Sequence, residues 1–93
     1  MSRNDTVGKH ATVIYSNGEY QCVKYHQTDV VMWNDKEIVF NSGGWTTNTT
    51  KLRMNQASNQ FYLGFGVYQE KWEWYVTYKG ETIAFEDGMR LTR

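Results

Sequence analysis

The residues best suited to chemistry lie in NSGGWTTNTTKLRMNQ, positions 41–56. This segment combines two adjacent glycines, a tryptophan, several threonines, a lysine and an arginine, and it contains no acidic residue. A glycine loop that leads into a helix start offers free backbone N–H groups and the positive end of the helix dipole, an arrangement that binds phosphate. The segment therefore predicts a site for an anionic ligand, either a nucleotide or a short nucleic-acid segment.

The predicted ligand-binding residues carry small side chains, hydrogen-bond donors or a positive charge. They are Ser42, Gly43, Gly44, Trp45, Thr47, Thr50, Lys51, Arg53 and Asn55, with His26 and Asp29 at the border. The double glycine would supply backbone donors and the tryptophan a stacking surface, while the amides Asn55, Gln56 and Asn59 would form an exposed face for a partner. The simpler alternative is a tight turn, a capped helix and two basic residues that only keep the surface soluble.

Other reactive side chains give weaker signals. A histidine near an aspartate, as in His26 and Asp29, can act as an oriented base, so a small hydrolase is the least favoured function. The chain has no G-x-S-x-G or G-x-x-x-x-G-K-[ST] motif, and we expect no enzymatic activity and no cofactor. Cys22 and His26 would lie roughly 13 Å apart on a strand, too far to share a metal ion, so Cys22 is expected to be structural.

Composition limits the class of protein. The 93 residues include 10 basic and 10 acidic side chains, so the chain lacks the net positive charge of a general nucleic-acid binder. Its length predicts one β-rich domain over residues 10–93, preceded by a flexible polar tail at 1–9. The absence of a long apolar run predicts no membrane contact, and a single cysteine is typical of a reducing cytoplasm.

These residues must be positioned by short strands. In ATVIYSNGEYQCVKY, Asn17-Gly18 favours a two-residue turn that pairs Tyr15 with Tyr20. The strands DVVMW and EIVF, at 29–33 and 37–40, predict a second hairpin. The expected buried face of the first hairpin consists of Ala11, Val13, Tyr15, Tyr20 and Cys22.

The C-terminal third predicts four consecutive strands that share one buried face. Large apolar residues alternate with small or polar ones in FYLGFGV and WEWYVTY, and a short loop at Glu70-Lys71 would set Val67 against Trp74, and Tyr75 against Gly66. Two more turns would extend the same sheet, and the last strand would pair with the one before it, so that Phe85 meets Leu91.

Residues 47–60 break the strand pattern and predict one helix, with Thr46, Thr47 or Asn48 as its cap. Its inner stripe would consist of Thr47, Thr50, Met54, Ala57 and Phe61. The expected fold class is α+β, mostly β. We expect an antiparallel sheet or small open barrel of about seven to eight strands, with the helix inserted between two groups of strands.

The string SGGW-x-T-x-TTK-x-RMNQ, preceded by YHQTDVV and followed by QFYLGFGVYQEKWEWYVTY, resembles a set of small proteins encoded by bacteriophages. The similarity runs from about residue 22 to residue 87 and does not include residues 1–9. The resemblance implies a phage origin and a location in the cytoplasm of a bacterial host. It also implies action by binding to a host component, as small phage proteins without catalytic motifs often do.

Two other partners remain open. The surplus of tyrosines and tryptophans, together with Leu52 on the helix, suits a protein inhibitor or adaptor that binds a host protein through exposed aromatic and helix surface. Affinity that hardly changes with salt would favour this function over phosphate binding. A sheet edge could also pair with a second copy and form a homodimer.

Overall fold

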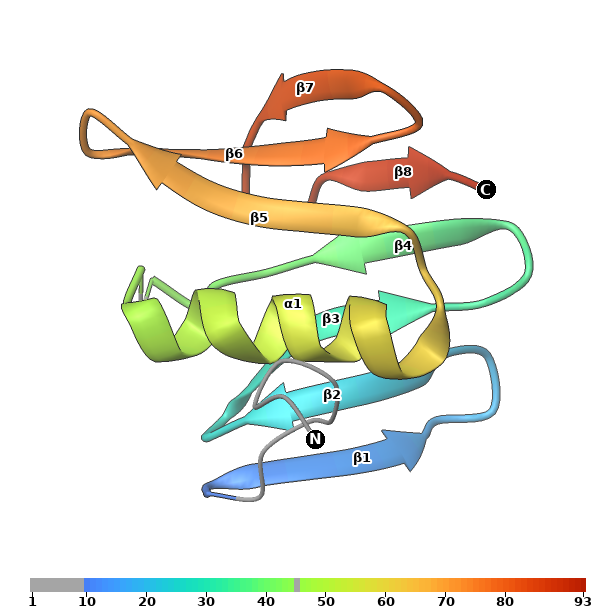
Figure 1. Ribbon diagram of the computed structural model, residues 1–93. Helices are drawn as coiled ribbons and strands as arrows, with labels where there is room; N and C mark the ends of the chain where they lie inside the picture. The colour runs from blue at the N-terminus through green and yellow to red at the C-terminus, as the bar shows by residue number, and fades with distance from the viewer. Residues whose placement is uncertain (1–9, 45) are drawn as a thin grey trace.

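The computed structural model describes residues 10–44 and 46–93, so the predicted tail and Trp45 lie outside the described residues. The elements follow the order β1 Thr12–Ser16, β2 Gln21–Tyr25, β3 Thr28–Trp33, β4 Glu37–Phe40, α1 Asn48–Phe61, β5 Phe65–Glu70, β6 Glu73–Tyr78, β7 Glu81–Ala84 and β8 Arg90–Thr92. The predicted fold class is confirmed. Two antiparallel sheets, ordered β1-β2-β3-β4-β8 and β5-β6-β7, do not join into a closed barrel in the described chain, and α1 connects the two groups of strands (Figure 1).

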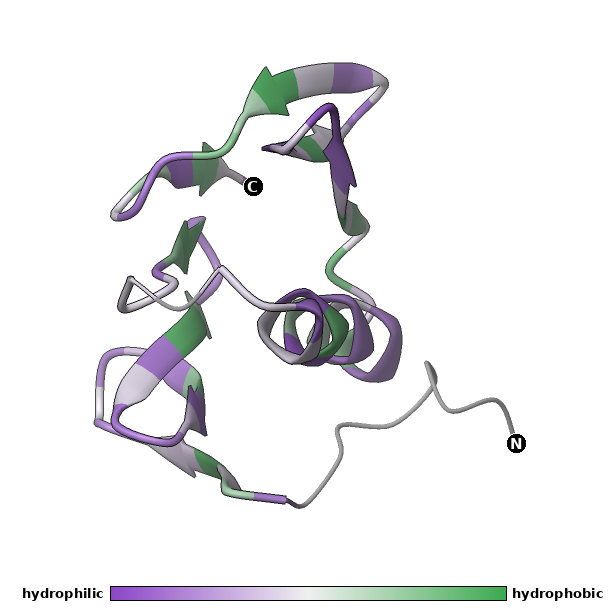
Figure 2. Ribbon diagram, turned by 90° about the vertical axis from the view of Figure 1, so that its left-hand side faces the viewer, coloured by the Kyte–Doolittle hydropathy of each residue, from purple (hydrophilic) through white to green (hydrophobic). Residues whose placement is uncertain are grey.

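The core forms where α1 meets both sheets. Met54 and Ala57 of α1 are fully buried against Val23 and Val31 of the five-stranded sheet and belong to one cluster with Val67 of β5. Figure 2 looks along the helix, which fills the angle between the two sheets. Because α1 contacts both sheets, its buried surface is wider than the single stripe that the sequence predicted. Thr50, Met54 and Ala57 are buried as expected, and Arg53, Gln56 and Ser58 are buried as well.

The first hairpin has a longer loop than predicted. Tyr15 pairs with Cys22 rather than with Tyr20. The reason is the side chain of Asn17, whose Oδ1 accepts the N–H groups of Glu19 and Tyr20 and holds a four-residue loop. The predicted buried face was also wrong, because α1 covers the opposite face of the hairpin. On that face Val23 belongs to the core cluster, and Tyr25 packs against it.

The second group of strands keeps its predicted buried face, but the pairs between β5 and β6 differ from the prediction. Lys71 and Trp72 form the turn, so Val67 pairs with Val76, and Tyr75 lies opposite Tyr68 rather than opposite Gly66. The pairing differs from the prediction by two residues. Because side chains alternate with a period of two, the same residues still point inward.

The last strand was assigned to the wrong sheet. Instead of pairing with β7, β8 crosses to the first sheet, where Leu91 pairs with Ile38 of β4. The loop before it is bound to β4 by two backbone hydrogen bonds, from Gly88 N–H to the Phe40 carbonyl at 2.7 Å and from Phe40 N–H to the Met89 carbonyl at 3.1 Å. These bonds between distant segments have no local sequence signal. Phe85 remains in ring contact with Trp74, as the predicted pairing of strands six and seven requires.

Candidate functional site

The loop before α1 uses its donors within the fold. Ser42 is buried, and its N–H and Oγ both donate to the carboxylate of Asp87, at 2.8 and 3.0 Å. The N–H of Gly43 donates to Asn41 Oδ1, and that of Gly44 donates to Ser42 Oγ. An acidic side chain thus already occupies the position where the sequence predicted an anion, and the predicted double-glycine cradle does not form.

Gly43 has a structural role. Its φ of +63° lies in the left-handed region, and an added Cβ would lie 2.1 Å from Thr28 Oγ1. The glycine therefore allows the loop to pack against the start of β3. This position fits the simpler alternative, in which the double glycine makes a tight turn.

The two predicted cations point in different directions. Lys51 Nζ donates to Gln69 on β5 and lies 5.5 Å from the centre of the Trp74 ring. Arg53 is only 7% exposed, and its guanidinium donates to Thr12 Oγ1 at 2.9 Å and to Gln56 Oε1 at 3.1 Å. The two side chains cannot bind the same ligand, because Lys51 points toward β5 and Arg53 points toward β1 on the other side of the helix.

Two of the three residues of the predicted amide face, Asn55 and Gln56, are used within the fold, whereas Asn59 is exposed. Asn55 bonds to both backbone groups of Val67, at 2.8 Å each, and so acts as an additional pairing partner for β5. Gln56 is buried beside Arg53. Thr50 is also buried; its N–H and hydroxyl both contact Thr47 Oγ1, which caps the helix as predicted.

His26 and Asp29 do not form an oriented pair. Asp29 Oδ1 accepts a hydrogen bond from the Tyr15 hydroxyl at 2.7 Å, and this bond raises the pKa of Tyr15. His26 lies in the β2–β3 turn, with its ring 4.3 Å from that of Tyr25 and 6.3 Å from that of His10. Cys22 is fully buried, as expected of a structural residue, and burial raises the pKa of its thiol.

A cavity joins part of the predicted site. It has a volume of about 500 Å³, lies between the β2–β3 turn and the start of α1, and is lined by Tyr25, His26, Gln27, Thr47 and Thr49. His26 and Thr47 were predicted site residues, and the structure brings them together. Tyr25 and Gln27 were missed. No local pattern reveals their role, because only tertiary packing places the β2–β3 turn beside the helix start.

The surroundings of this cavity favour negative charge. In the first turn of α1, Thr50 N–H contacts Thr47 Oγ1, and the helix itself offers no acceptor to the N–H groups of Asn48 and Thr49. The guanidinium of Arg53 lies 5.6 Å from the centre of the Tyr25 ring. Among the residues that the structure describes, none that lines the cavity is acidic. The positive end of the helix dipole and the positive charge of Arg53 therefore both favour a negatively charged ligand in the cavity.

The part of the chain that the structure describes has neither a metal-binding cluster nor a membrane-spanning helix. Residues 10–44 and 46–93 contain no group of three His, Cys, Asp or Glu side chains placed to hold a metal ion. Within the same ranges, no helix is long and apolar enough to cross a membrane.

Comparison with known proteins identifies the family. The model of the family described as Kyanoviridae Gp96 protein matches residues 1–92. The match includes residues 1–9, to which the resemblance seen in the sequence did not extend. No curated protein and no solved structure matches the chain. The predicted phage origin is confirmed: the chain is phage-encoded and belongs to the Kyanoviridae Gp96 family.

Proposed function

We propose that this phage protein is a non-enzymatic binding protein whose cavity between the β2–β3 turn and α1 holds a phosphate-bearing ligand, a nucleotide or a nucleic-acid end. The observation that carries the proposal is the cavity itself, because His26 and the helix start both line one space of about 500 Å³. This volume lies within the usual range for small-molecule sites.

Each wall suits one part of such a ligand. A phosphate fits the first turn of α1, where Thr49 lines the cavity and its N–H group and hydroxyl can donate to it. A base can stack on the exposed ring of His26, which lies 4.3 Å from the Tyr25 ring and is tilted from it by 57°. The proposal therefore keeps the predicted ligand class but replaces most of the predicted residues.

Calorimetric titration tests the proposal with three probes: adenosine, adenosine monophosphate and a short oligothymidylate. We expect the two phosphate-bearing probes to bind and adenosine to bind at least tenfold more weakly. We also expect the affinity for the oligonucleotide to fall as salt rises. Equal binding of adenosine and its monophosphate, or no binding of any probe, would refute the proposed ligand class.

A matched pair of variants locates the site. His26→Asn retains a residue that tolerates the local φ of +55° but removes the stacking ring, so it should weaken binding by about 1–3 kcal/mol. Lys51→Ala removes a cation that does not line the cavity and should leave the affinity unchanged. The opposite ranking of the two variants would move the site to the groove between α1 and β5, which is lined by Lys51, Leu52, Asn55 and Gln69 among others.

A further inference from the structure

The β5–β6 turn has an unusual sequence for its geometry. Lys71 and Trp72 have φ values of +51° and +72°, and the flanking pair is Glu70 with Glu73. A two-residue hairpin turn with two positive φ values favours Asn-Gly, because bulky side chains are strained in the left-handed region. A tryptophan at its second position is therefore unfavourable for folding.

The next turn of the same sheet provides an internal comparison. Lys79 and Gly80 join β6 to β7 with φ values of +50° and +79°, between the paired residues Tyr78 and Glu81. The two turns share their backbone form and their first residue, and they differ at the second, where one has glycine and the other Trp72. The indole is 91% exposed, so packing within the described chain does not offset the strain.

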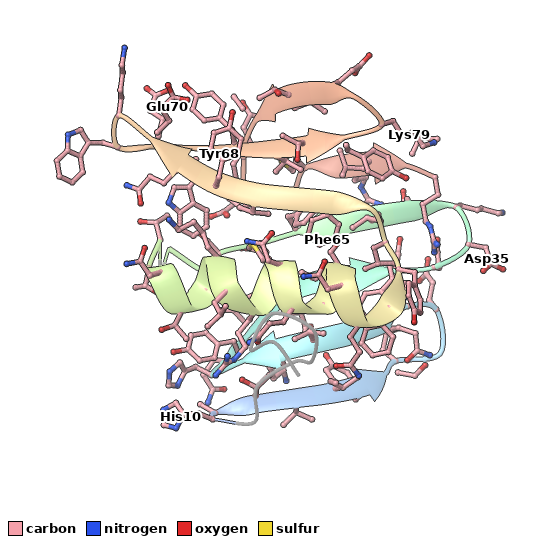
Figure 3. All side chains as sticks on the ribbon, in the orientation of Figure 1. His10, Asp35, Phe65, Tyr68, Glu70 and Lys79 are labelled. Atoms are coloured by element: carbon pink, nitrogen blue, oxygen red, sulfur yellow. The ribbon has the colours of Figure 1, made fainter. Side chains whose placement is uncertain are left out.

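The surface around Trp72 is aromatic and has a net negative charge, because the exposed Glu70 and Glu73 outnumber the exposed Lys71 between them. Tyr68 and Tyr75 lie opposite each other on the outer face of the hairpin, with stacked rings 5.5 Å apart. Glu70 and Glu73 are both exposed, and Glu73 Oε2 accepts a hydrogen bond from the Tyr75 hydroxyl at 3.2 Å. Figure 3 shows Tyr68 and Glu70 on this hairpin, with Glu70 toward its turn. We call Tyr68, Glu70, Trp72, Glu73 and Tyr75 the hairpin surface.

We propose that the hairpin surface docks onto a host protein, with the Trp72 indole in an apolar pocket whose rim carries lysine or arginine. Tryptophan is among the residues that most often dominate interface energies. The two glutamates exceed the single lysine of the turn, and the net negative charge matches a basic rim and steers the encounter. The same carboxylates repel phosphate, so the charge disfavours nucleic acid and anionic membranes as occupants. This inference goes beyond the proposed function, because it requires no ligand in the cavity.

Site-specific photo-cross-linking tests the docking. The full chain carries a benzoylphenylalanine in place of Trp72 and is illuminated in a lysate of the host bacterium. A second protein carries the same group in place of Tyr62, the matched control, because Tyr62 is 89% exposed and also has a positive φ, of +58°. We expect a discrete protein adduct from position 72 that position 62 does not give.

Competition with unlabelled protein decides whether the adduct reflects this surface. Wild type and His26→Asn should suppress the adduct equally, whereas Trp72→Gly and the double variant Glu70→Lys/Glu73→Lys should be at least tenfold weaker competitors. Trp72→Gly is expected to fold, since glycine suits the turn. The proposal is overturned by no adduct, by an adduct that nuclease removes, by the same adduct from position 62, or by equal competition from all variants. Loss of competition by His26→Asn alone would assign the contact to the cavity instead.

Discussion

Arg53 shows how a residue suited to ligand binding can serve the fold instead. Its donors bond to Thr12 on β1 and to Gln56 on its own helix, and its guanidinium lies beside the Tyr25 ring. The residue thus connects α1 to the edge of the five-stranded sheet. The sequence could not show this, because an arginine on a helix has the same pattern whether it faces solvent or a strand.

Replacing Arg53 should therefore change stability. Arg53→Met keeps much of the apolar length but removes both donated bonds, and we expect a loss of about 2–4 kcal/mol in the free energy of unfolding, measured by urea denaturation. Lys51→Ala, which removes an exposed bond to Gln69, should lose less than about 1 kcal/mol. Equal losses in the two variants would contradict the assignment of Arg53 to the fold.

Glu37 predicts a pH dependence. Its carboxylate accepts hydrogen bonds from the Tyr20 hydroxyl and from Arg90, and these bonds hold its pKa below the ordinary value of 4.5. A carboxyl whose pKa is lowered on folding stabilises the fold above its unfolded pKa, and this contribution is lost as pH falls through the folded value. The thermal midpoint should drop below about pH 4.5, and Glu37→Gln should show a smaller drop. An identical acid response in the variant would show that Glu37 is not responsible.

At the scale of elements, Asn55 joins α1 to the second sheet. Its side chain pairs with both backbone groups of Val67, so Asn55→Ala leaves two half-buried groups without this partner. We expect a loss of about 1–3 kcal/mol and faster amide exchange at Val67. Asn55→Asp retains the acceptor for the Val67 N–H but sets a carboxylate against the carbonyl, so Val67 should be no better protected than in the alanine variant at neutral pH. Unchanged exchange in both variants would mean that the bonds contribute little.

The turns at Lys71-Trp72 and Lys79-Gly80 give a pair of predictions about backbone strain. Trp72→Gly should raise the free energy of unfolding by about 1 kcal/mol, because glycine removes the left-handed penalty. Gly80→Ala should lower it by a similar amount, and no atom lies within 4 Å of the added Cβ, so the effect is purely conformational. Thermal unfolding of both variants measures the difference. A destabilising Trp72→Gly change would show that the indole supports the fold and would remove the argument from strain.

The elements themselves were largely predictable, because they depend on local patterns. Alternation placed the strands, the break in that alternation placed α1, and Thr47 caps it as expected. The register of the hairpins was less accessible. Asn17 closes a longer loop through its side chain, and Lys71-Trp72 adopts a turn that its residue types disfavour. Such outcomes depend on competition between similar turns, which residue types alone do not resolve.

At the scale of the whole molecule, the missed features are contacts between distant segments. The β8 crossover depends on hydrogen bonds between residues 88–89 and Phe40. Ser42 is not available to a ligand, because its N–H group donates to the carboxylate of Asp87. The cavity likewise exists because the β2–β3 turn, the helix start and the packing of α1 come together at one end of the molecule (Figure 1). The sequence could identify the donor-rich helix start but not the wall that faces it.

The most direct test of the phosphate-binding cavity is a titration of the isotope-labelled protein with adenosine monophosphate, followed by the chemical shifts of the backbone amides. The account predicts saturable shifts that are largest at Thr47, Thr49 and His26, and a His26→Asn variant that needs a higher ligand concentration, by about fivefold or more, to reach the same shifts at Thr47 and Thr49. Largest shifts at Lys51 and Gln69, or shifts that never saturate, would contradict it.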